Sequence, residues 1–380
     1  MSTWTQSSRN AGTAMAPRRT PLHDQHVAAG ARMVDFAGWE MPQQYRSVKE
    51  EQDAVRTAVG IFDVSHMGRF EARGSGAGEF LQRTVTNDLT RVGPGQAQYT
   101  LLCRPDGGIV DDLVVYRPEL DRWAVVVNAS NREKDWAWLR DHAPEGVDLV
   151  DRSDELGLLA VQGPGVGRLL AVEDVQLDAV PYFGVTEGTL AGVRMMLSRT
   201  GYTGEDGFEL FVPAERAAAI WSVLLEAGAV PCGLAARDVC RLEAGLRLYG
   251  TDMDERTNPY EAGLGWTVKL DKGDFVGRDA LRQARAEGPR RILAGLACAE
   301  RTIPRHGARV RREGADVGEV TSGTHSFWLG RGIAMASLDP ASRTIGTQLA
   351  IDSRGGEGRA EVVALPFYRG SVRPAARAQA

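Results

Sequence analysis

The sequence predicts an α+β fold, in which two mixed α/β subdomains with largely antiparallel sheets precede a small C-terminal β-barrel domain. Strand and helix patterns alternate up to residue 288 and include hairpin signals, which is typical of α+β units. From residue 289 the chain has strand and turn signals at close intervals and almost no helical periodicity, as in a small barrel. The length of 380 residues also exceeds the usual size of one domain.

Local signals predict each element of the first subdomain. A helix should begin after Ser47, because Ser47 and Glu50 form a capping box, and should end at Gly60. A second capping box, Ser130 with Glu133, predicts the start of a helix over 130–143. Alternating and helical patterns between them predict, in chain order, strands at 61–65 and 68–74, a helix over 76–89, a hairpin of strands 99–104 and 109–117, and a strand at 123–130.

The second subdomain repeats this pattern. Its predicted elements are a strand, glycine turn and helix over 156–172, two strands about a turn at 193–213, and amphipathic helices at 215–228 and 233–250. A charged helix end and Pro289 then mark a break in composition. We therefore predict a flexible tail at 1–19, a two-subdomain region at 20–288, a barrel domain at 289–373 and a flexible tail at 374–380.

Composition narrows the classes of function. A net charge of −5 argues against nucleic acid as the main partner, which would normally leave a basic domain or stripe. No apolar run approaches the ~18 residues of a membrane span, and the first nineteen residues lack the apolar segment of a secretory signal. The 4 cysteines form no CxxC pair and no HExxH motif occurs, so we expect reduced thiols, no metal and a cytoplasmic location.

Two glycine-rich turns are similar to a dinucleotide-binding fingerprint but do not meet it. They begin at Gly74 and Gly163, and each joins a predicted strand to a helix. The fingerprint needs a third glycine three places after its second, where this chain has Glu79 and Arg168. We interpret both stretches as tight turns.

Asp111 and Asp112 lie side by side before the apolar run of the predicted hairpin. Successive side chains of a strand point to opposite faces, so only one of the two carboxylates can face a given cavity. We expect one to be functional and the other to be solvated or capping. The alternative, that both hold backbone N–H groups after Gly108, stays open on spacing alone.

Glu209 raises a similar question, because it lies in an apolar strand and needs a hydrogen-bond donor. Arg237, in the last predicted helix of the region, could be that donor, since a guanidinium pairs well with a carboxylate. A structural ion pair between the two is therefore one interpretation.

Seven ordered motifs carry a resemblance to a known family, the aminomethyltransferases (T proteins) of the glycine cleavage system. The resemblance runs from about Thr20 to the end and includes TSGT and PF elements in the barrel region. The motifs are FDVSHMGRFE (62–71), DGGIVDDLVVY (106–116), VVNASNREKD (126–135), AVQGP (160–164), RTGYTGEDGFEL (199–210), GLAARDVCRLEAGLRLYG (233–250) and NPYEAGLGWTVKL (258–270).

The resemblance implies a central cavity for tetrahydrofolate, which accepts a one-carbon unit from the aminomethyl-lipoyl arm of the H protein while ammonia is released. It implies that Asp111 is catalytic, that it faces the folate, and that Asp112 faces away. A pterin ring calls for aromatic neighbours and for a carboxylate that accepts from its edge. The residues expected to bind the folate are Met67, Tyr99, Asn128, Tyr182, Tyr202, Glu209, Arg237 and Trp266.

Other activities share this folate cavity. Tetrahydrofolate-dependent demethylases act on small methylated donors without a carrier protein, and sequence alone separates them poorly from aminomethyltransferases. Non-catalytic folate-binding relatives carry a KGCYxGQE-like segment, where this chain has RTGYTGEDGFE without a cysteine. The chain also departs from the family at His325–Trp328, which could alter packing or the donor that is accepted.

Overall fold

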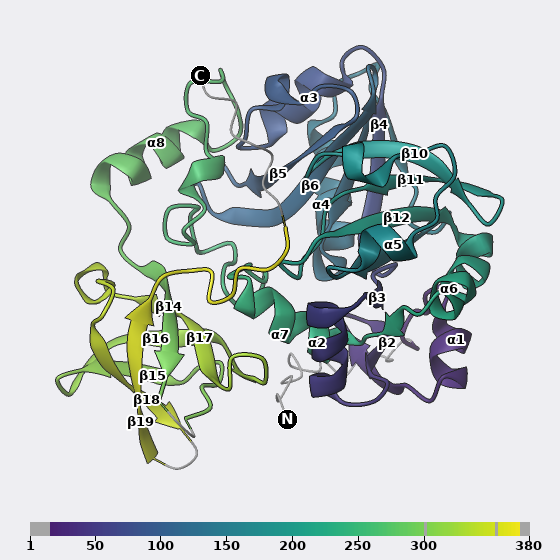
Figure 1. Cartoon of the computed structure of the whole chain (residues 1–380). Coiled ribbons are helices and arrows are strands. Elements are labelled where there is room, and N and C mark those ends of the chain that lie inside the picture. The colour runs from purple at the N-terminus through teal and green to yellow at the C-terminus, as the bar shows by residue number, and fades with distance from the viewer. Residues whose placement is uncertain (1–15, 300–301, 354–355, 373–380) are drawn as a thin grey trace.

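The computed structural model describes residues 16–299, 302–353 and 356–372. The predicted tail at 374–380 lies outside the described residues, as does most of the tail at 1–19. Within the described part, strands form a two-stranded hairpin, a five-stranded sheet, a six-stranded sheet and a closed barrel (Figure 1). The predicted α+β class with a C-terminal barrel is confirmed.

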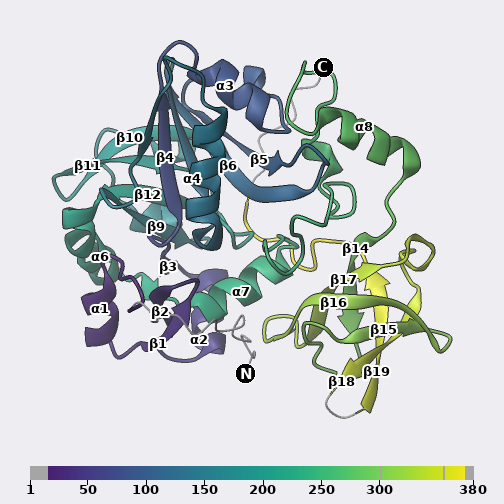
Figure 2. The same cartoon turned by 180° about the vertical axis from the view of Figure 1, so that it is seen from behind.

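The five-stranded sheet contains the predicted hairpin. Its strand order is β5 (Gln96–Cys103), β6 (Ile109–Glu119), β7 (Arg122–Val127), β4 (Gly68–Arg73) and β8 (Asp148–Asp151), with every neighbouring pair antiparallel. Helices α3 (Ala77–Thr84) and α4 (Arg132–His142) cover one face, as Figure 2 shows. Phe80 of α3 and Leu139 of α4 share one apolar core with Val115 of β6, and burial of such side chains stabilises this layer.

The six-stranded sheet has the order β10 (Val185–Leu190), β11 (Val193–Ser198), β12 (Gly207–Pro213), β9 (Leu156–Gln162), β3 (Gly60–Asp63) and β13 (Val230–Pro231). Its outer face packs against α5 (Val166–Leu169) and α6 (Ala217–Glu226), and His26 of α1 (His23–Ala28) is hydrogen-bonded to Asp63 of β3. Its inner face meets the five-stranded sheet, where Phe62, Leu158 and Phe211 pack with Tyr116 and Val126. The two sheets therefore form a sandwich whose outer faces are covered by helices.

The remaining helices lie between the sandwich and the barrel or at their edges. They are α2 (Val48–Thr57), α7 (Leu234–Glu243) and α8 (Arg278–Glu287), with the hairpin β1 (Arg32–Phe36) and β2 (Trp39–Gln44) beside α7. The predicted cap of α2 is confirmed, because Ser47 Oγ accepts from the backbone N–H of Glu50. The predicted cap of α4 is wrong. A 3₁₀ turn over Ala129–Asn131 delays the helix, and Asn131 occupies the N-cap without a side-chain cap bond.

The C-terminal barrel closes in the order β14 (Ile292–Cys298), β17 (Arg331–Leu338), β16 (Ala315–Ser326), β15 (Arg309–Arg312), β18 (Gln348–Ser353) and β19 (Gly356–Val363). Further 3₁₀ turns lie at Leu89–Arg91, Leu177–Ala179, Ala214–Arg216, Gly265–Thr267 and Pro340–Ser342. Apolar side chains such as Leu296, Val320 and Ile351 fill the barrel interior. Closure leaves no unpaired edge in such a sheet, which removes a route to aggregation. The four cysteines are buried and free, as expected.

A buried ionic network joins α2, α7 and the barrel. Arg56 of α2 donates to Glu243 of α7 and to Glu205 in the turn before β12. Ser326, at the end of β16, also donates to Glu243. These contacts hold the barrel and the helix that carries Arg237 in one arrangement.

Candidate active site

Asp111 is fixed inside the protein by three N–H donors. Its Oδ2 accepts from the backbone N–H of Asn128 at 3.0 Å. Its Oδ1 accepts from the side-chain amides of Asn128 at 2.8 Å and of Asn131 at 2.7 Å. The side chain is 0% exposed. Asp111 therefore holds the end of β7 and the turn before α4, on the side of the sheet that α4 covers.

Asp112 lies on the opposite face of β6 and is not turned to open solvent. Tyr99 of β5 donates its hydroxyl hydrogen to Asp112 Oδ2 at 3.0 Å, and Asn128 Nδ2 donates to Oδ1 at 2.8 Å. Burial, with the charge of Asp111 as the second cause, raises the pKa of Asp112 to about 7. Tyr99 and Trp266, stacked with their ring centroids 5.9 Å apart, lie on the side of the sheet that Asp112 faces. The expectation that Asp111 faces the folate and Asp112 faces away stays a prediction.

Arg237 lies on α7 and has a free donor. Its Nη1 is buried, and no acceptor contacts it among the described residues. The guanidinium carbon lies 4.7 Å from the ring centroid of Tyr202, a cation–π distance. Burial lowers the pKa of Arg237, and the charge of Glu209 opposes that effect. A buried N–H group without an acceptor is costly unless a ligand supplies one.

Glu209 does not form the structural ion pair with Arg237 that the sequence allowed. Its Oε2 accepts from Thr200 Oγ1 at 2.6 Å and from the hydroxyl of Tyr116 at 3.3 Å. The side chain is nearly buried, so these donors satisfy the need for partners that its apolar strand created. The ion-pair interpretation is therefore wrong for this structure.

Several residues predicted to bind folate are close enough to Asp112 or Glu209 for these carboxylates to affect their pKa values. The charge of Asp112 adds to burial in raising the pKa values of Tyr99 and Tyr202. Glu209 likewise adds to burial in raising the pKa of Tyr182. Met67, which is partly buried, packs against the core between the sheets. Trp266 is 58% exposed, which places its ring at the rim of the site.

Several polar residues near the site are not among those predicted from the sequence. His66 is buried with Nδ1 unpartnered, and burial lowers its pKa to about 3, so its ring is neutral. Arg247 adds a second, half-buried guanidinium near Tyr99, and it donates to the carbonyls of Gly245 and Ala262. Asn131 fixes Asp111. Packing between segments far apart in the sequence brings these residues together, so spacing alone does not identify them. His66 and Asn131 nevertheless lie within two of the ordered motifs.

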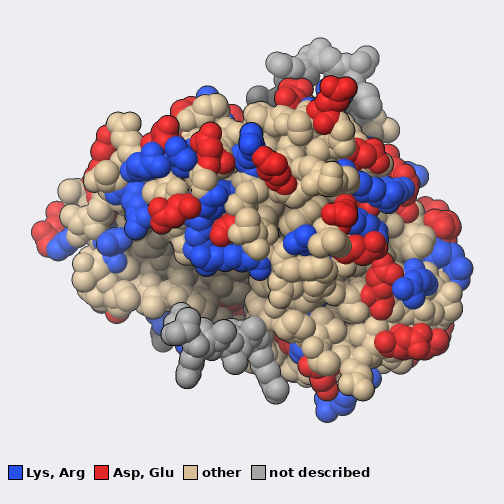
Figure 3. All heavy atoms as spheres, turned by 90° about the horizontal axis from the view of Figure 1, so that it is seen from above, with Lys and Arg blue, Asp and Glu red and all other residues tan. Residues whose placement is uncertain are grey.

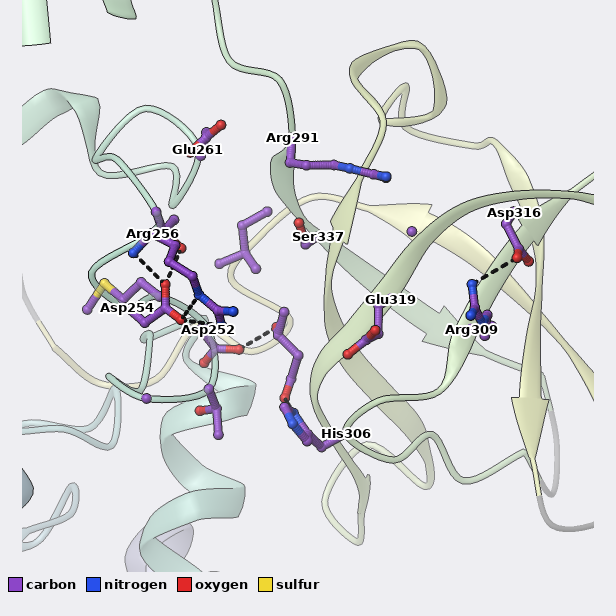
Figure 4. A pocket seen from close by; sticks show the side chains of 17 residues that line it. Asp252, Asp254, Arg256, Glu261, Arg291, His306, Arg309, Asp316, Glu319 and Ser337 are labelled. Atoms are coloured by element: carbon purple, nitrogen blue, oxygen red, sulfur yellow. Dashed lines mark hydrogen bonds and ion pairs between the residues drawn. The ribbon is translucent and has the colours of Figure 1, made fainter. Parts of the chain in front are cut away.

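A separate hollow of about 590 Å³ lies between the 250–261 segment and the barrel (Figure 4). Two ion pairs lie within its lining, Arg256 with Asp254 at 2.7 Å and Arg309 with Asp316 at 2.9 Å. None of the residues predicted to bind folate lines it. The view from above in Figure 3 shows another hollow in the surface, with Lys and Arg side chains along part of its rim.

Two further classes of feature are absent from the part of the chain that the structure describes. No group of three or more His, Cys, Asp or Glu side chains there has the arrangement needed to hold a metal ion. The helices in the same residues are all too short or too polar to cross a membrane.

Comparison with known proteins decides the family. A model of the GCVT N-terminal domain matches residues 22–272, and a model of the glycine cleavage T-protein C-terminal barrel domain matches residues 291–369. The chain belongs to the glycine cleavage T-protein family. The family predicted from the ordered motifs is thereby confirmed.

Full-length relatives agree with this assignment to the T-protein family. The chain is 50% identical to an aminomethyltransferase of Thermotoga neapolitana, with 94% of this chain and 99% of the relative covered. It is 47% identical to an aminomethyltransferase of Geobacillus kaustophilus, with 93% of this chain and 99% of the relative covered. The crystal structure of the glycine cleavage system aminomethyltransferase T from Bartonella henselae matches with a TM-score of 0.88 at 34% identity. The match covers 93% of this chain and 99% of that one. The predicted enzyme class, an aminomethyltransferase of the glycine cleavage system, is confirmed.

Proposed function

We propose that this aminomethyltransferase takes the one-carbon unit from the aminomethyl-dihydrolipoyl arm of the H protein and transfers it to tetrahydrofolate, with release of ammonia and formation of 5,10-methylenetetrahydrofolate. One observation carries the folate part of the proposal. Arg237 is half-buried, and its buried Nη1 has no acceptor; the side chain lies beside Tyr202, and the charges of Asp112 and Glu209 act in the same region.

The residues present fit a folate. The pterin ring has apolar faces and an edge of donors and acceptors, so it needs aromatic neighbours together with fixed polar groups. Tyr99, Tyr202 and Trp266 supply the aromatic rings, and Arg237 supplies an unused donor. Both hydrogen bonds that Glu209 accepts end on Oε2, which leaves Oε1 for the donor edge of the ring. Asn128, Met67 and Tyr182 complete the proposed binding set.

Tetrahydrofolate supplies the nitrogen nucleophiles that accept the one-carbon unit, and the chain supplies charge and position. Asp112, with a pKa near 7, can hold or accept a proton in the neutral range. Its carboxylate would also stabilise the positive charge that develops when ammonia leaves the carbon attached to sulfur. Tyr99 and Asn128 hold both of its oxygens, so the carboxylate is positioned before substrate binds.

The geometry favours Asp112 over Asp111 for contact with the substrate. Asp111 is surrounded by N–H donors of Asn128 and Asn131, whereas Asp112 shares its face of the sheet with Tyr99 and Trp266. We therefore assign Asp112 as the catalytic carboxylate and Asp111 as a residue that positions it through Asn128. The catalytic role of Asp111 that the resemblance implied stays a prediction, and the same experiment tests both assignments.

The reaction itself is tested with purified protein, tetrahydrofolate and aminomethyl-loaded lipoylated H protein. Formation of ammonia and methylenetetrahydrofolate in equal amounts is the expected result. Methyl transfer from a small methylated donor, without ammonia from the loaded H protein, would replace the proposal with a tetrahydrofolate-dependent demethylase. Binding of tetrahydrofolate, measured by calorimetry, tests the folate site independently of either donor.

Paired variants test the assignment of the two aspartates. Asp112→Asn should lower kcat by about 10²–10⁴-fold with little change in tetrahydrofolate affinity, because a positioned proton acceptor is lost. Asp111→Asn should be milder, since the amide keeps an oxygen that can accept from Asn128. Asp121→Asn, at an exposed turn after β6, is the matched control and should be neutral. A severe loss in Asp111→Asn with a mild one in Asp112→Asn would reverse the assignment.

A further inference from the structure

Asp135 is a buried carboxyl group that the proposed reaction does not use. It lies in the first turn of α4 and is 0% exposed. Neither of its oxygens accepts a hydrogen bond from an N–H or hydroxyl group of the described residues. Asp135 lies one helical turn after Asn131, whose side-chain amide donates to Asp111 at 2.7 Å, and the charge of Asp111 acts on it. Two ionised carboxylates are both acceptors only, so a hydrogen bond between Asp135 and Asp111 requires a proton on one of them.

The surroundings of the two groups favour Asp135 as the one that carries the proton. Asp111 already receives three N–H donors from Asn128 and Asn131, and such donors stabilise the ionised form. Asp135 receives none. A carboxyl group buried without donors is most stable when neutral. Consistent with this, burial raises the pKa of Asp135 well above its usual range, with Asp111 as the next cause.

The charged groups around Asp135 do not offer it another partner. Asp111 and Asp112 on β6 both disfavour its ionisation, and Lys134 on α4 favours it. Lys134 Nζ is nevertheless directed elsewhere, since it donates to the carbonyl of Val110 at 2.7 Å, to Tyr249 at 3.0 Å and to Glu255 at 3.3 Å. Burial raises the pKa of Tyr249, with Asp111, Glu255 and Asp135 adding to it, so this hydroxyl stays neutral as well.

We propose that Asp135 is a positioning residue, which stays protonated at neutral pH and donates its proton to Asp111. The Asp111 carboxylate is then fixed from two sides, by Asp135 and by the two asparagines. Asn128 Nδ2 contacts both Asp111 and Asp112, so a fixed Asp111 also fixes the orientation of Asp112. The shared proton removes one negative charge from a cluster of three carboxyl groups, which allows Asp112 to ionise near neutral pH.

This inference rests on the proposed role of Asp112, but its first test does not need catalysis. Carbon-13 NMR of protein labelled at the aspartate carboxyl groups should show one carboxyl that stays protonated at a pH well above 7. That signal should disappear in Asp135→Asn. An Asp135 resonance that titrates near the usual value of about 4 would overturn the proposal. The wild-type titration alone decides this point if the variant does not fold.

Kinetics of matched variants test the positioning role. Asp135→Ala removes the donor to Asp111 and should lower kcat about tenfold to a hundredfold, the usual effect of losing a hydrogen bond to a charged group. Asp135→Asn keeps an N–H donor but cannot titrate, so it should recover most of that loss. Asp141→Ala, on the exposed side of the same helix, is the control. Equal losses in the Asn and Ala variants would contradict the donor role.

If aminomethyl transfer is absent in the wild-type enzyme while the protonated carboxyl is present, the proposed function fails and the shared proton stands. If transfer is present and the protonated carboxyl is absent, the inference about Asp135 fails and the proposed function stands. The two outcomes are therefore distinguishable.

Discussion

Replacing Arg56 should destabilise the whole protein, because its guanidinium is the only cation within ion-pair distance of two buried carboxylates among the described residues. Nη1 lies 2.8 Å from Glu205 Oε1, and Nη2 lies 2.6 Å from Glu243 Oε2. The same guanidinium donates to the carbonyl of Thr203 at 2.8 Å and to that of Cys240 at 3.3 Å. Arg56 is 4% exposed, so solvent cannot replace it.

The size of the effect follows from what the substitution leaves behind. Arg56→Met keeps much of the side-chain volume but leaves Glu205 and Glu243 without their cation, at 3% and 0% exposure. Removing one partner of a buried ion pair costs about 3–5 kcal/mol in the free energy of unfolding. At about 2–4 °C per kcal/mol for a large domain, Tm should fall by roughly 6–20 °C.

Urea unfolding followed by tryptophan fluorescence, together with thermal unfolding, measures this loss. The matched control is Arg83→Met, because Arg83 pairs with Glu79 at 2.7 Å while both side chains are 70% exposed. That exposed pair should contribute less than about 1 kcal/mol. The reasoning is refuted if Arg56→Met costs no more than the control. Since α7 carries both Glu243 and Arg237, tetrahydrofolate affinity should fall in Arg56→Met as well.

Three further predictions concern the hairpin that carries the aspartates. Gly108→Ala should cost about 1–3 kcal/mol in urea unfolding, since the added carbon would lie 2.0 Å from the carbonyl oxygen of Glu255. The control is Gly93→Ala, whose added carbon would lie 3.4 Å from its nearest neighbour, Gln96 Oε1. Equal losses of stability in the two variants would contradict the clash. Tyr99→Phe removes the 3.0 Å donor to Asp112, which lowers the pKa of that carboxyl group. The pH–rate profile should therefore move to higher pH by about one unit or less. No shift, or a shift to lower pH, would argue against the contact. The raised pKa of Asp112, about 7, means that the native state binds this proton more tightly than the unfolded state. The free energy of unfolding of the wild type should therefore fall, relative to Asp112→Asn, by up to roughly 4 kcal/mol as pH rises from about 4 to 7, and parallel stability curves would rule this out.

The sequence by itself determined the local elements and their order. The turn around Pro105 and Gly108 predicted the β5–β6 hairpin, and Ser47 predicted the start of α2, because both signals act within a few residues. The spacing of strand signals after residue 289 predicted the barrel. Ordered motifs predicted the family and the residues proposed for the folate site.

Tertiary structure decided how the polar groups are used. Alternation along β6 required Asp111 and Asp112 to face opposite sides, but which side α4 covers and which side Tyr99 shares depends on packing between distant segments. The same holds for Arg237, whose partner could not be read from spacing, and for Asp135, on which the charge of Asp111 acts only after α4 packs on the sheet. Burial and neighbouring charge set the protonation of a carboxyl group, and both arise only when the chain is folded.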